Sequence, residues 1–415
     1  MTMKAHGYCC TVLWLAALAL VHDAYAFTTA GRSASYRRSP WGLTKLSSTS
    51  PAAVSASTDS SLGDVQSSSD GKDKKKFTDE GEHPVAVRAP LKFIGPYPTL
   101  ALRFPKLATS SQRSRNATGV SLDFVLDTAA NVNTINGQVA KELELDVVGS
   151  AVPGVGASGA LSGGDTFMLG DTELEGVGEK FTFMTGLTAS ALPVASPAAA
   201  GLMSLAFLQS FQGVEFTWGS SSSDGEQKPA AVTFLSETPP QVLEDLVKVP
   251  IQRIPVTQLP SVTIEVNGVK MPALLDTGSP VTVFNAEAAR RCGIDTVQSV
   301  EGDNKKSGNP LSNMASRLAR AQAASRGDVL TILGSDGRQI DLLKSSDKTS
   351  VKMLGSKEFE TVIFGESRVY VGDLPGLAAL NGLGVDSPPA VVLGMDVLRT
   401  RPKMLLKAQN DEVWF

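Results

Sequence analysis

The chain has 415 residues, 42% of them hydrophobic and 19% charged, and its formal net charge is -4 at pH 7. This length suggests two or three globular domains, and the charge balance gives no electrostatic reason to expect a nucleic-acid partner. All three histidines, His6, His22 and His83, precede residue 84. The body of the chain therefore lacks the imidazole that a Ser-His-Asp or Cys-His protease, or a histidine-based zinc site, requires. We expect chemistry that needs no metal and no cofactor.

Residues 1–26 have the pattern of a secretory signal peptide. Lys4 is followed by an apolar run from Cys9 to Val21 and by the small-residue pattern Ala24-Tyr25-Ala26, which is typical of a cleavage site. The apolar run is too short to cross a membrane comfortably. We therefore expect the mature form to have no membrane association.

The next segment, residues 27–58, is basic and rich in Ser and Thr, and no acid occurs between Asp23 and Asp59. A signal peptide followed by such a segment resembles the bipartite presequence of algae with secondary plastids, which implies a plastid location. The alternative is secretion or delivery to a vacuole, with this segment as a disordered pro-region. Residues 59–84 are polar and charged, which predicts a disordered linker. Once the leader is removed, Cys292 has no cysteine partner, so we expect no intramolecular disulfide.

One stretch of the body occurs twice. Phe124-Val125-Leu126-Asp127-Thr128-Ala129-Ala130 and Ala273-Leu274-Leu275-Asp276-Thr277-Gly278-Ser279 both place an acid and a threonine after three residues of an apolar strand. The match continues without a gap, always 149 positions apart: Asn136 with Asn285, Ala140 with Ala289, and Asp146 with Asp295. Packing does not explain an acid at the end of an apolar strand, so we interpret each stretch as supplying one buried carboxylate.

The segments around each acid also correspond. Alternating apolar residues predict strands at 98–104 and 260–266, upstream of each acid. The pair Asn267-Gly268 predicts a tight hairpin turn after the second of these strands. Helices are expected after each acid, at 137–145 and 286–292.

These patterns predict two lobes, residues 85–245 and 246–415, with a polar surface insertion in the second at about 301–328. Within the insertion, Pro310 to Arg326 has apolar residues on one helical face, which favours a solvated surface helix over a partner-binding one. Each lobe is expected to close on an apolar element around a glycine, Gly201 in the first and Gly394 in the second. Terminal hairpins are expected from Val214–Trp218 with Ala231–Leu235 and from Met404–Leu406 with Val413–Phe415.

A glycine-rich, β-prone run extends from Gly154 to Gly170. Gly154, Gly156 and Gly159 formally match GxGxxG, but Pro153 interrupts the preceding strand and no helix follows to bind a phosphate. We therefore disfavour a dinucleotide site. A mobile β-hairpin fits the glycines better.

Taken together, residues 85–415 resemble the aspartic proteases, in their bilobal pepsin-like and single-lobe retropepsin-like forms. The resemblance implies an all-β fold of two pseudo-twofold-related orthogonal β-barrel lobes with short helices. It implies that Asp127 and Asp276 are catalytic and that the hydroxyls of Thr128 and Thr277 reach across to the opposite lobe. By the same resemblance the supporting residues are Thr128, Ala129, Ala130, Thr277, Gly278 and Ser279, and the flap contains Gly154, Gly156 and Gly159.

The resemblance implies an aspartic endopeptidase that cleaves an extended peptide or protein substrate. Two carboxyls held about 3 Å apart share one proton, which is the general behaviour of an aspartic protease dyad. One then acts as a base toward water and the other as an acid toward the amide carbonyl, without histidine or metal. Because two fused lobes remove the need for a dimer, we expect a monomer.

The chain departs from the family pattern at three places. Ala129 stands where the family has glycine, so the alternative function is a catalytically impaired pseudoprotease that binds extended peptides. Ser279 is matched by Ala130 in the first lobe, and its hydroxyl predicts that Asp276 is the more acidic partner and that Asp127 carries the shared proton. None of the five tyrosines lies between Gly149 and Thr188, so the hairpin lacks the flap tyrosine of pepsins.

Overall fold

The computed structural model describes thirteen segments of the chain. They are residues 86–113, 119–151, 154–156, 159–161, 163–177, 181–191, 198–221, 227–255, 257–297, 322–333, 339–357, 359–374 and 388–415. The predictions for residues 1–26, 27–58 and 59–84 lie outside these segments. So does most of the predicted insertion, including all but the last residues of the expected helix at 310–326.

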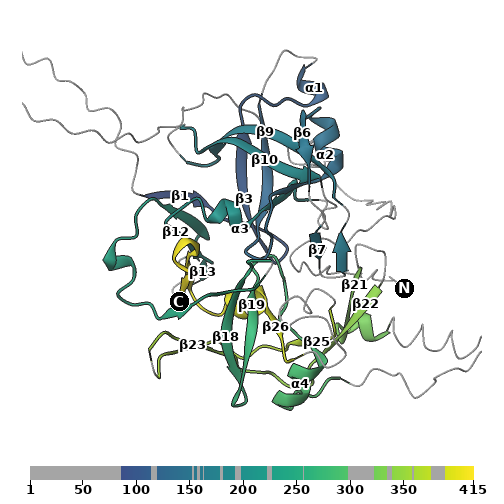
Figure 1. The fold of residues 1–415 in the computed structure, drawn as a ribbon, viewed down its shortest axis with the longest axis vertical. Helices are drawn as coiled ribbons and strands as arrows, with labels where there is room; N and C mark the ends of the chain where they lie inside the picture. Colours follow the sequence, from purple (N-terminus) through teal and green to yellow (C-terminus); the bar gives the residue numbers. More distant parts are fainter. Residues whose placement is uncertain are drawn as a thin grey trace, which may run out of the picture.

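The described chain is an all-β protein of two lobes with short helices, as expected (Figure 1). The first lobe, blue to teal, occupies the upper half of Figure 1, and the second, green to yellow, the lower half. The short helices of the two lobes are α1 (Ser110–Arg113), α2 (Gly137–Glu142), α3 (Leu205–Leu208), α4 (Ala286–Cys292) and α7 (Met395–Leu398), with 3-10 turns η1 (Pro240–Val242) and η3 (Ala408–Asn410). Within the described segments, no helix has the length and apolar character that a membrane crossing needs.

The first lobe is built on an eight-stranded sheet that closes on itself. In spatial order its strands are β2 (Lys92–Ile94), β3 (Tyr97–Phe104), β4 (Val120–Leu126), β11 (Gly201–Met203), β5 (Thr134–Ile135), β10 (Met184–Ala191), β9 (Asp165–Leu174) and β6 (Val147–Ser150). β9 also pairs with β3, through Leu102 opposite Leu174 and Arg103 opposite Glu173. This second pairing turns the sheet into a barrel.

The second lobe is built on a ten-stranded sheet. Its main path is β21 (Val329–Leu333), β22 (Gln339–Lys344), β25 (Tyr370–Val371), β20 (Val283–Phe284), β26 (Val391–Leu393), β19 (Val269–Leu275), β18 (Pro260–Val266), β23 (Lys352–Leu354) and β24 (Thr361–Ile363), and β17 (Gln252–Arg253) pairs with β18. The predicted turn between β18 and β19 is confirmed. Asn267 and Gly268 both have positive φ, 48° and 78°, which is the backbone that a two-residue hairpin requires.

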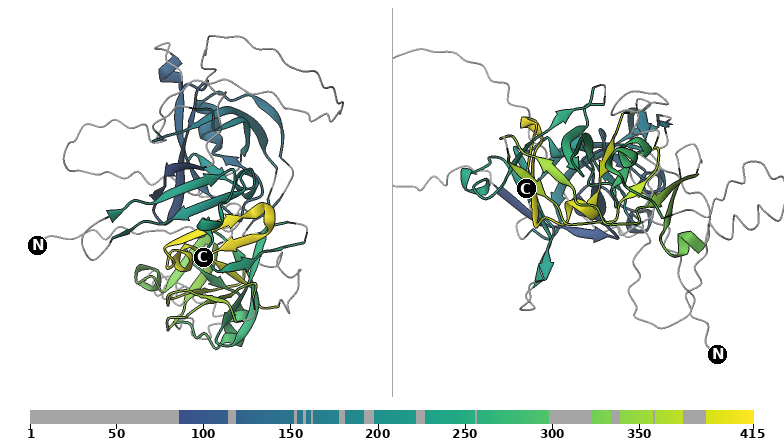
Figure 2. Two further views of the ribbon diagram at one scale, coloured as in Figure 1. Left: turned by 90° about the vertical axis from the view of Figure 1, so that its left-hand side faces the viewer. Right: turned by 90° about the horizontal axis from the view of Figure 1, so that it is seen from below.

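A six-stranded sheet joins the two halves of the chain. Its order is β1 (Ala86–Pro90), β15 (Ala231–Leu235), β12 (Gly213–Thr217), β27 (Lys403–Lys407), β28 (Glu412–Trp414) and β16 (Lys248–Pro250). The left view of Figure 2 shows the yellow C-terminal strands lying beside teal strands of the first half, between the lobes. Both predicted terminal hairpins are present, and β12 pairs with β27 to unite them.

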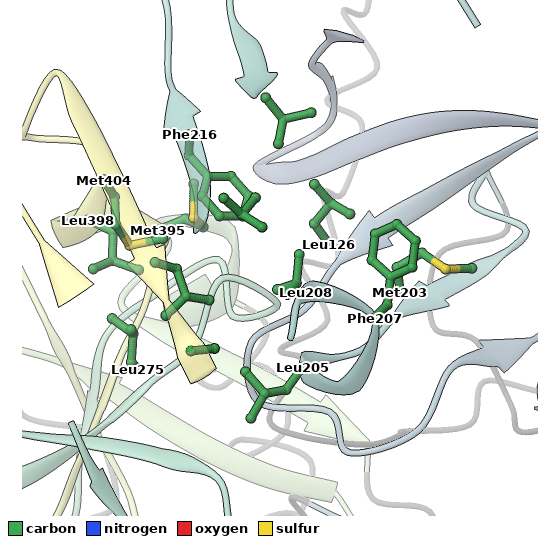
Figure 3. Close-up of a cluster of buried hydrophobic side chains, with 14 of the residues drawn as sticks. Leu126, Met203, Leu205, Phe207, Leu208, Phe216, Leu275, Met395, Leu398 and Met404 are labelled. Atoms are coloured by element: carbon green, nitrogen blue, oxygen red, sulfur yellow. The ribbon is translucent and has the colours of Figure 1, made fainter. Parts of the chain in front are cut away.

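One hydrophobic core extends through both lobes. Figure 3 shows Leu126, Met203 and Phe207 of the first half and Leu275, Met395 and Leu398 of the second, all buried members of one cluster. Phe216 of β12 and Met404 of β27 are fully buried in the same cluster. Burying apolar surface at about 25 cal/mol per Å² makes such a shared core a strong restraint on the relative position of the lobes.

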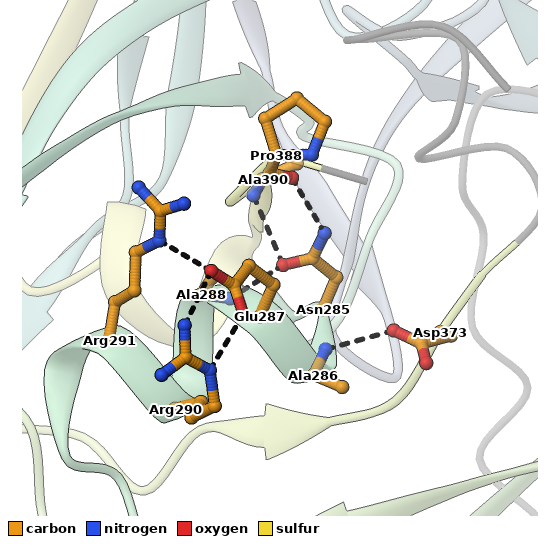
Figure 4. Close-up of polar contacts among 9 residues, drawn as sticks. All are labelled: Asn285, Ala286, Glu287, Ala288, Arg290, Arg291, Asp373, Pro388 and Ala390. Atoms are coloured by element: carbon orange, nitrogen blue, oxygen red, sulfur yellow. Dashed lines mark hydrogen bonds and ion pairs between the residues drawn. The ribbon is translucent and has the colours of Figure 1, made fainter. Parts of the chain in front are cut away.

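The two lobes use corresponding residues as helix caps. Asn136 caps α2 by accepting the N–H of Gln138, and Asn285 caps α4 by accepting that of Ala288. Asn285 does more than cap. Its Oδ1 also accepts the N–H of Ala390, and its Nδ2 donates to the carbonyl of Pro388 at 3.0 Å (Figure 4). α4 is thereby tied to the strand that follows residue 388.

Gly201 and Gly394 lie in or next to corresponding strands, β11 and β26, but are offset by three positions. β11 sets Gly201 opposite Phe124, whereas β26 sets Val391 opposite Ala273, the residue that corresponds to Phe124. Gly394 therefore corresponds to Ser204. The two glycines meet different needs, because a Cβ at Gly201 would collide with the carbonyl of Thr134 and one at Gly394 with that of Val281.

Candidate active site

Asp127 and Asp276 are each positioned by the end of a buried strand. β4 ends at Leu126 and β19 at Leu275, and both leucines are fully buried in the core. The N–H of Asp127 donates to the carbonyl of Met203 at 2.9 Å, and that of Asp276 to the carbonyl of Leu393 at 3.1 Å. Both acids have no exposed surface. The strands therefore deliver two carboxyls into the interior where the lobes meet.

Two threonines connect the loops that carry these acids. The hydroxyl of Thr128 donates to the carbonyl of Leu275 at 2.7 Å, and the hydroxyl of Thr277 donates to the carbonyl of Leu126 at 2.7 Å. Each hydroxyl also accepts the backbone N–H of the other threonine, at 3.0 and 3.1 Å. The four bonds are buried and cross between the lobes, so they hold the two strand ends against each other.

The two carboxyls have matching partners. Oδ1 of Asp127 accepts the N–H of Ala129 at 2.8 Å, and Oδ1 of Asp276 accepts the N–H of Gly278 at 2.8 Å. Within the described segments, Oδ2 of each acid is buried and accepts no N–H or hydroxyl. A side-chain hydrogen bond with Asp276 acts on the Asp127 carboxyl and lowers its pKa.

Burial raises the pKa of both acids, because it removes water from the charged form. For Asp276, the negative charge of Asp127 raises the pKa further, well above its ordinary value. For Asp127, the N–H of Ala129, the hydrogen bond from Asp276 and the N–H of Ala130 oppose the rise. Burial therefore favours the protonated form of both carboxyls over what each would have in water. A neutral acid beside an ionised one offers an acid and a base at a single point.

The reason for expecting Asp276 to be the more acidic partner does not hold, and the order of the two pKa values stays a prediction. The expectation relied on the hydroxyl of Ser279, which instead donates to the carbonyl of Val281 at 2.7 Å. Ser279 acts on the Asp276 carboxyl only through its backbone N–H, as Ala130 does on Asp127. The residue type could not reveal this, because a serine hydroxyl next to a turn often bonds the local backbone.

Ala130 and Ser279 also have matching structural roles. The carbonyl of Ala130 accepts the N–H of Leu205 at 2.8 Å, and that of Ser279 accepts the N–H of Met395 at 2.8 Å. These bonds attach each acid-bearing loop to the first residue of a short helix, α3 or α7. Both residues are buried.

Gly278 and Ala129 differ in the space around them. A Cβ added to Gly278 would lie 2.5 Å from Oδ2 and 2.7 Å from Oδ1 of Asp127, which is closer than Cβ atoms approach other atoms. Ala129 has a Cβ, has no exposed surface, and packs in a small apolar cluster with residues of the second lobe, including Ile254 and Leu259. The departure from glycine is thus accommodated by an apolar contact between the lobes.

The glycine-rich run forms a hairpin. β7 (Gly154–Gly156) pairs with β8 (Gly159–Leu161), with Gly156 opposite Gly159. This agrees with the hairpin interpretation and not with a phosphate loop before a helix. Its role as a flap stays a prediction.

Tyr97, the first residue of β3, was not anticipated as part of this site. It is 7% exposed, and its pKa is raised by burial and then by the charges of Asp276 and Asp127. The strand pattern predicted β3 but gave no sign that its first residue lies near both acids. Elsewhere in the described segments, no group of three or more His, Cys, Asp or Glu side chains could hold a metal ion.

Comparisons with known proteins find a family match within the second lobe. Residues 262–343, which include Asp276, match the family model described as aspartyl protease. No curated protein matches the chain. Among solved structures, the chain is similar to an aspartic proteinase from Irpex lacteus, with 12% identity, a TM-score of 0.40, and coverage of 79% of this chain and 96% of that one. It is also similar to basic 7S globulin from soybean (11% identity, TM-score 0.40, 80% and 96% covered) and to conglutin gamma, a basic 7S globulin from lupine seeds (12%, 0.41, 80% and 95%).

Proposed function

We propose that this aspartic protease-like chain is an endopeptidase whose catalytic residues are Asp127 and Asp276. The observation that carries the proposal is the pair of fully buried carboxyls, one from each lobe, whose Oδ2 atoms have no other partner within the described segments. Two unpaired buried acids cost several kcal/mol. A fold that retains them at the meeting point of its lobes has a use for them beyond packing.

Hydrolysis by this pair needs no group from outside the chain except water. The ionised Asp127 takes a proton from a water molecule as the water oxygen bonds to the carbonyl carbon of the substrate. Asp276 gives its proton to the carbonyl oxygen, which forms a tetrahedral diol. The proton on Asp127 then passes to the amide nitrogen, Asp276 recovers one from a diol hydroxyl, and the C–N bond breaks to leave an acid and an amine.

The substrate class we propose is an extended peptide or protein segment. Such a segment can pair with strand edges through its backbone, and the hairpin β7–β8 would close over it as a flap and exclude water. We further propose a monomer in which the two lobes are copies of one ancestral unit. The proposed location is a plastid, or alternatively a secreted or vacuolar site.

Cleavage of a peptide library by the purified full chain tests the function. We expect wild-type protein to release defined products and Asp276→Asn and Asp127→Asn to lose at least about 1,000-fold in kcat/KM. Asp123→Asn is the matched control. Asp123 lies on β4, four residues before Asp127, but forms a surface ion pair with Lys92 at 3.1 Å, so its loss should leave cleavage unchanged. Equal products from wild type and Asp276→Asn would refute the proposed function.

The Ala129 methyl favours one second candidate, a protein that binds extended peptides without cleaving them. Gly278, which corresponds to Ala129, presents a backbone without a side chain to Asp127. At the corresponding position beside Asp276, Ala129 carries a Cβ. Peptide binding measured with the same library distinguishes the two. Binding without products, in wild type and in Asp276→Asn alike, would favour this candidate.

A further inference from the structure

The loop that carries Asp276, residues 276–282, is attached to the segment that follows β26. The main-chain bonds of Asp276 and Ser279 described above fix the first half of this loop. At the end of the loop, the hydroxyl of Thr282 accepts the N–H of Gly394 at 3.0 Å. Thr282 has no exposed surface, so water cannot replace a bond that it loses. The position of the loop therefore depends on how Thr282 is held.

A third acid, Asp396, holds Thr282 at two points. Its Oδ2 accepts the N–H of Thr282 at 2.9 Å, and its Oδ1 accepts the hydroxyl of Thr282 at 2.7 Å. The same Oδ1 also accepts the N–H of Val397 at 2.8 Å, within α7. An acid in the first turn of a helix is ordinary, but two of these three bonds go to the acid-bearing loop and not to α7.

The first lobe closes its loop without an acid. Asn133 corresponds to Thr282 by the spacing of 149 positions, and Ser204 corresponds to Gly394 by strand register. Oδ1 of Asn133 accepts both the N–H and the hydroxyl of Ser204, each at 3.0 Å. Two residues after Ser204, the first lobe has Ala206, which has no polar side-chain atom. The acid at position 396 is thus a feature of the second lobe, where a hydroxyl replaces the amide.

We propose that Asp396 is a positioning residue of the dyad, whose carboxyl accepts both bonds from Thr282 and so keeps Asp276 where it meets Asp127. Because its bonds go to Thr282 and Val397, Asp396 acts on the dyad through the loop and not on substrate. The kinetic part of the proposal rests on the protease function proposed above. The structural part, the placement of the two carboxyls, holds without it.

Two substitutions of Asp396 separate its hydrogen bonds from its charge. Asp396→Ala removes both acceptors and reproduces Ala206 of the first lobe. Asp396→Asn removes the charge, but its carbonyl oxygen can accept the N–H of Thr282 and its amide can donate to the hydroxyl. We expect Asp396→Ala to lower kcat on the order of 10- to 100-fold with KM little changed, as for a small misplacement of a reacting group. Asp396→Asn should recover most of that loss.

Thr282→Val tests the same attachment from the other side. It keeps the shape of the side chain but removes the hydroxyl that donates to Asp396 and accepts from Gly394. The loss in kcat should resemble that of Asp396→Ala, and the double variant should lose little more, because both substitutions break one connection. Asp171→Asn is the matched control. Asp171 is also a buried acid that accepts a backbone N–H, that of Gly186 at 3.3 Å, but it lies on β9 and forms an ion pair with Lys106.

A second measurement needs no activity. Titration of ¹³C-labelled aspartate carboxyls in the full chain without substrate, assigned with Asp127→Asn and Asp276→Asn, reports the dyad directly. Burial raises the pKa of both dyad acids, so a loop that moves and admits water should lower the upper apparent pKa of the pair. We expect this fall in Asp396→Ala and in Thr282→Val, but not in Asp396→Asn or Asp171→Asn.

The outcomes separate this proposal from the protease function. A folded Asp396→Ala protein with unchanged kcat and unchanged dyad titration would overturn the role of Asp396 and leave the protease function standing. Equal losses in Asp396→Ala and Asp396→Asn would also overturn it, because charge and not hydrogen bonding would then be responsible. If Asp396→Ala does not fold, Thr282→Val decides by the same two readouts. If wild type cleaves nothing but the titration changes as expected, the protease function fails and the role of Asp396 is supported.

Discussion

Thr128 and Thr277 belong to different lobes, their Oγ1 atoms lie 3.4 Å apart, and each hydroxyl donates to a main-chain carbonyl of the other lobe. Each threonine also donates its N–H to the hydroxyl of its partner. Because all these groups are buried, no water can replace a lost bond. This exchange fixes the two acid-bearing loops relative to each other.

Replacing Thr277 by Val should therefore destabilise the protein. The substitution keeps the shape of the side chain but leaves the carbonyl of Leu126 and the N–H of Thr128 without the Thr277 hydroxyl. Unsatisfied buried groups of this kind cost about 3 kcal/mol together. Urea unfolding measures the change, and Thr277→Ser, which keeps the hydroxyl, should lose only about 1 kcal/mol. Equal losses in the two variants would contradict this interpretation.

The two small residues beside the acids should respond differently to exchange: Gly278→Ala should reduce activity, whereas Ala129→Gly should reduce stability. In Gly278→Ala, the new Cβ would approach both carboxyl oxygens of Asp127 within 2.7 Å, so the carboxyl must move. We expect peptide cleavage to fall at least about 100-fold, as for other misplacements near 1 Å. In Ala129→Gly, cleavage should persist, but loss of a buried methyl and gain of backbone freedom should cost about 1–2 kcal/mol. Peptide-cleavage kinetics and urea unfolding, measured on both variants, test these expectations. Loss of cleavage in Ala129→Gly but not in Gly278→Ala would contradict them.

Asp396, which is not part of the dyad, should make the free energy of unfolding depend on pH. Its Oδ2 accepts the N–H of Thr282 at 2.9 Å and its Oδ1 accepts the hydroxyl of Thr282 at 2.7 Å. Desolvation nevertheless raises the pKa of Asp396 to about 6. The folded protein therefore binds this proton more tightly than the unfolded chain. The stability that this tighter proton binding gives to the folded protein is fully present below the unfolded pKa near 4 and is lost as the pH rises through about 6.

The comparison that isolates this effect is wild type against Asp396→Asn, which mimics the neutral acid. Between pH 4 and 7, the unfolding free energy of wild type should fall relative to the variant by roughly 2 kcal/mol, a value reduced because the residue is partly exposed. Chemical unfolding at several pH values measures it. A constant difference across this range would show that Asp396 does not titrate as expected.

The two asparagine caps should differ in their contribution to stability. Asn285 makes three side-chain hydrogen bonds and is 4% exposed. For Asn136 the structure gives one such bond, to Gln138 at 2.8 Å, at a more exposed site. Asn136→Ala should cost about 1 kcal/mol and Asn285→Ala about 3 kcal/mol. Thermal unfolding of the pair checks the ranking, and similar losses would mean that the bonds of Asn285 to Pro388 and Ala390 contribute little.

Much of this fold could be predicted because its causes are local. Alternating apolar residues specify β18 at Pro260–Val266, Asn267-Gly268 specifies the turn that follows, and Asn285 specifies the start of α4. These features depend on side chains a few positions apart, which the sequence displays directly. The pairing of the segments around Asp127 and Asp276 was visible for the same reason, since both run in register without a gap.

The tertiary structure decided where chemically similar residues direct their polar groups and which distant residues meet. The Ser279 hydroxyl donates to the carbonyl of Val281 and not to Asp276, and the strand register places Gly201 in the position that Val391 has in the second lobe. Each outcome depends on strand register and on competition between nearby hydrogen-bond acceptors. Neither is encoded in the identity of one residue, because both are resolved only when separate strands pack and exclude water.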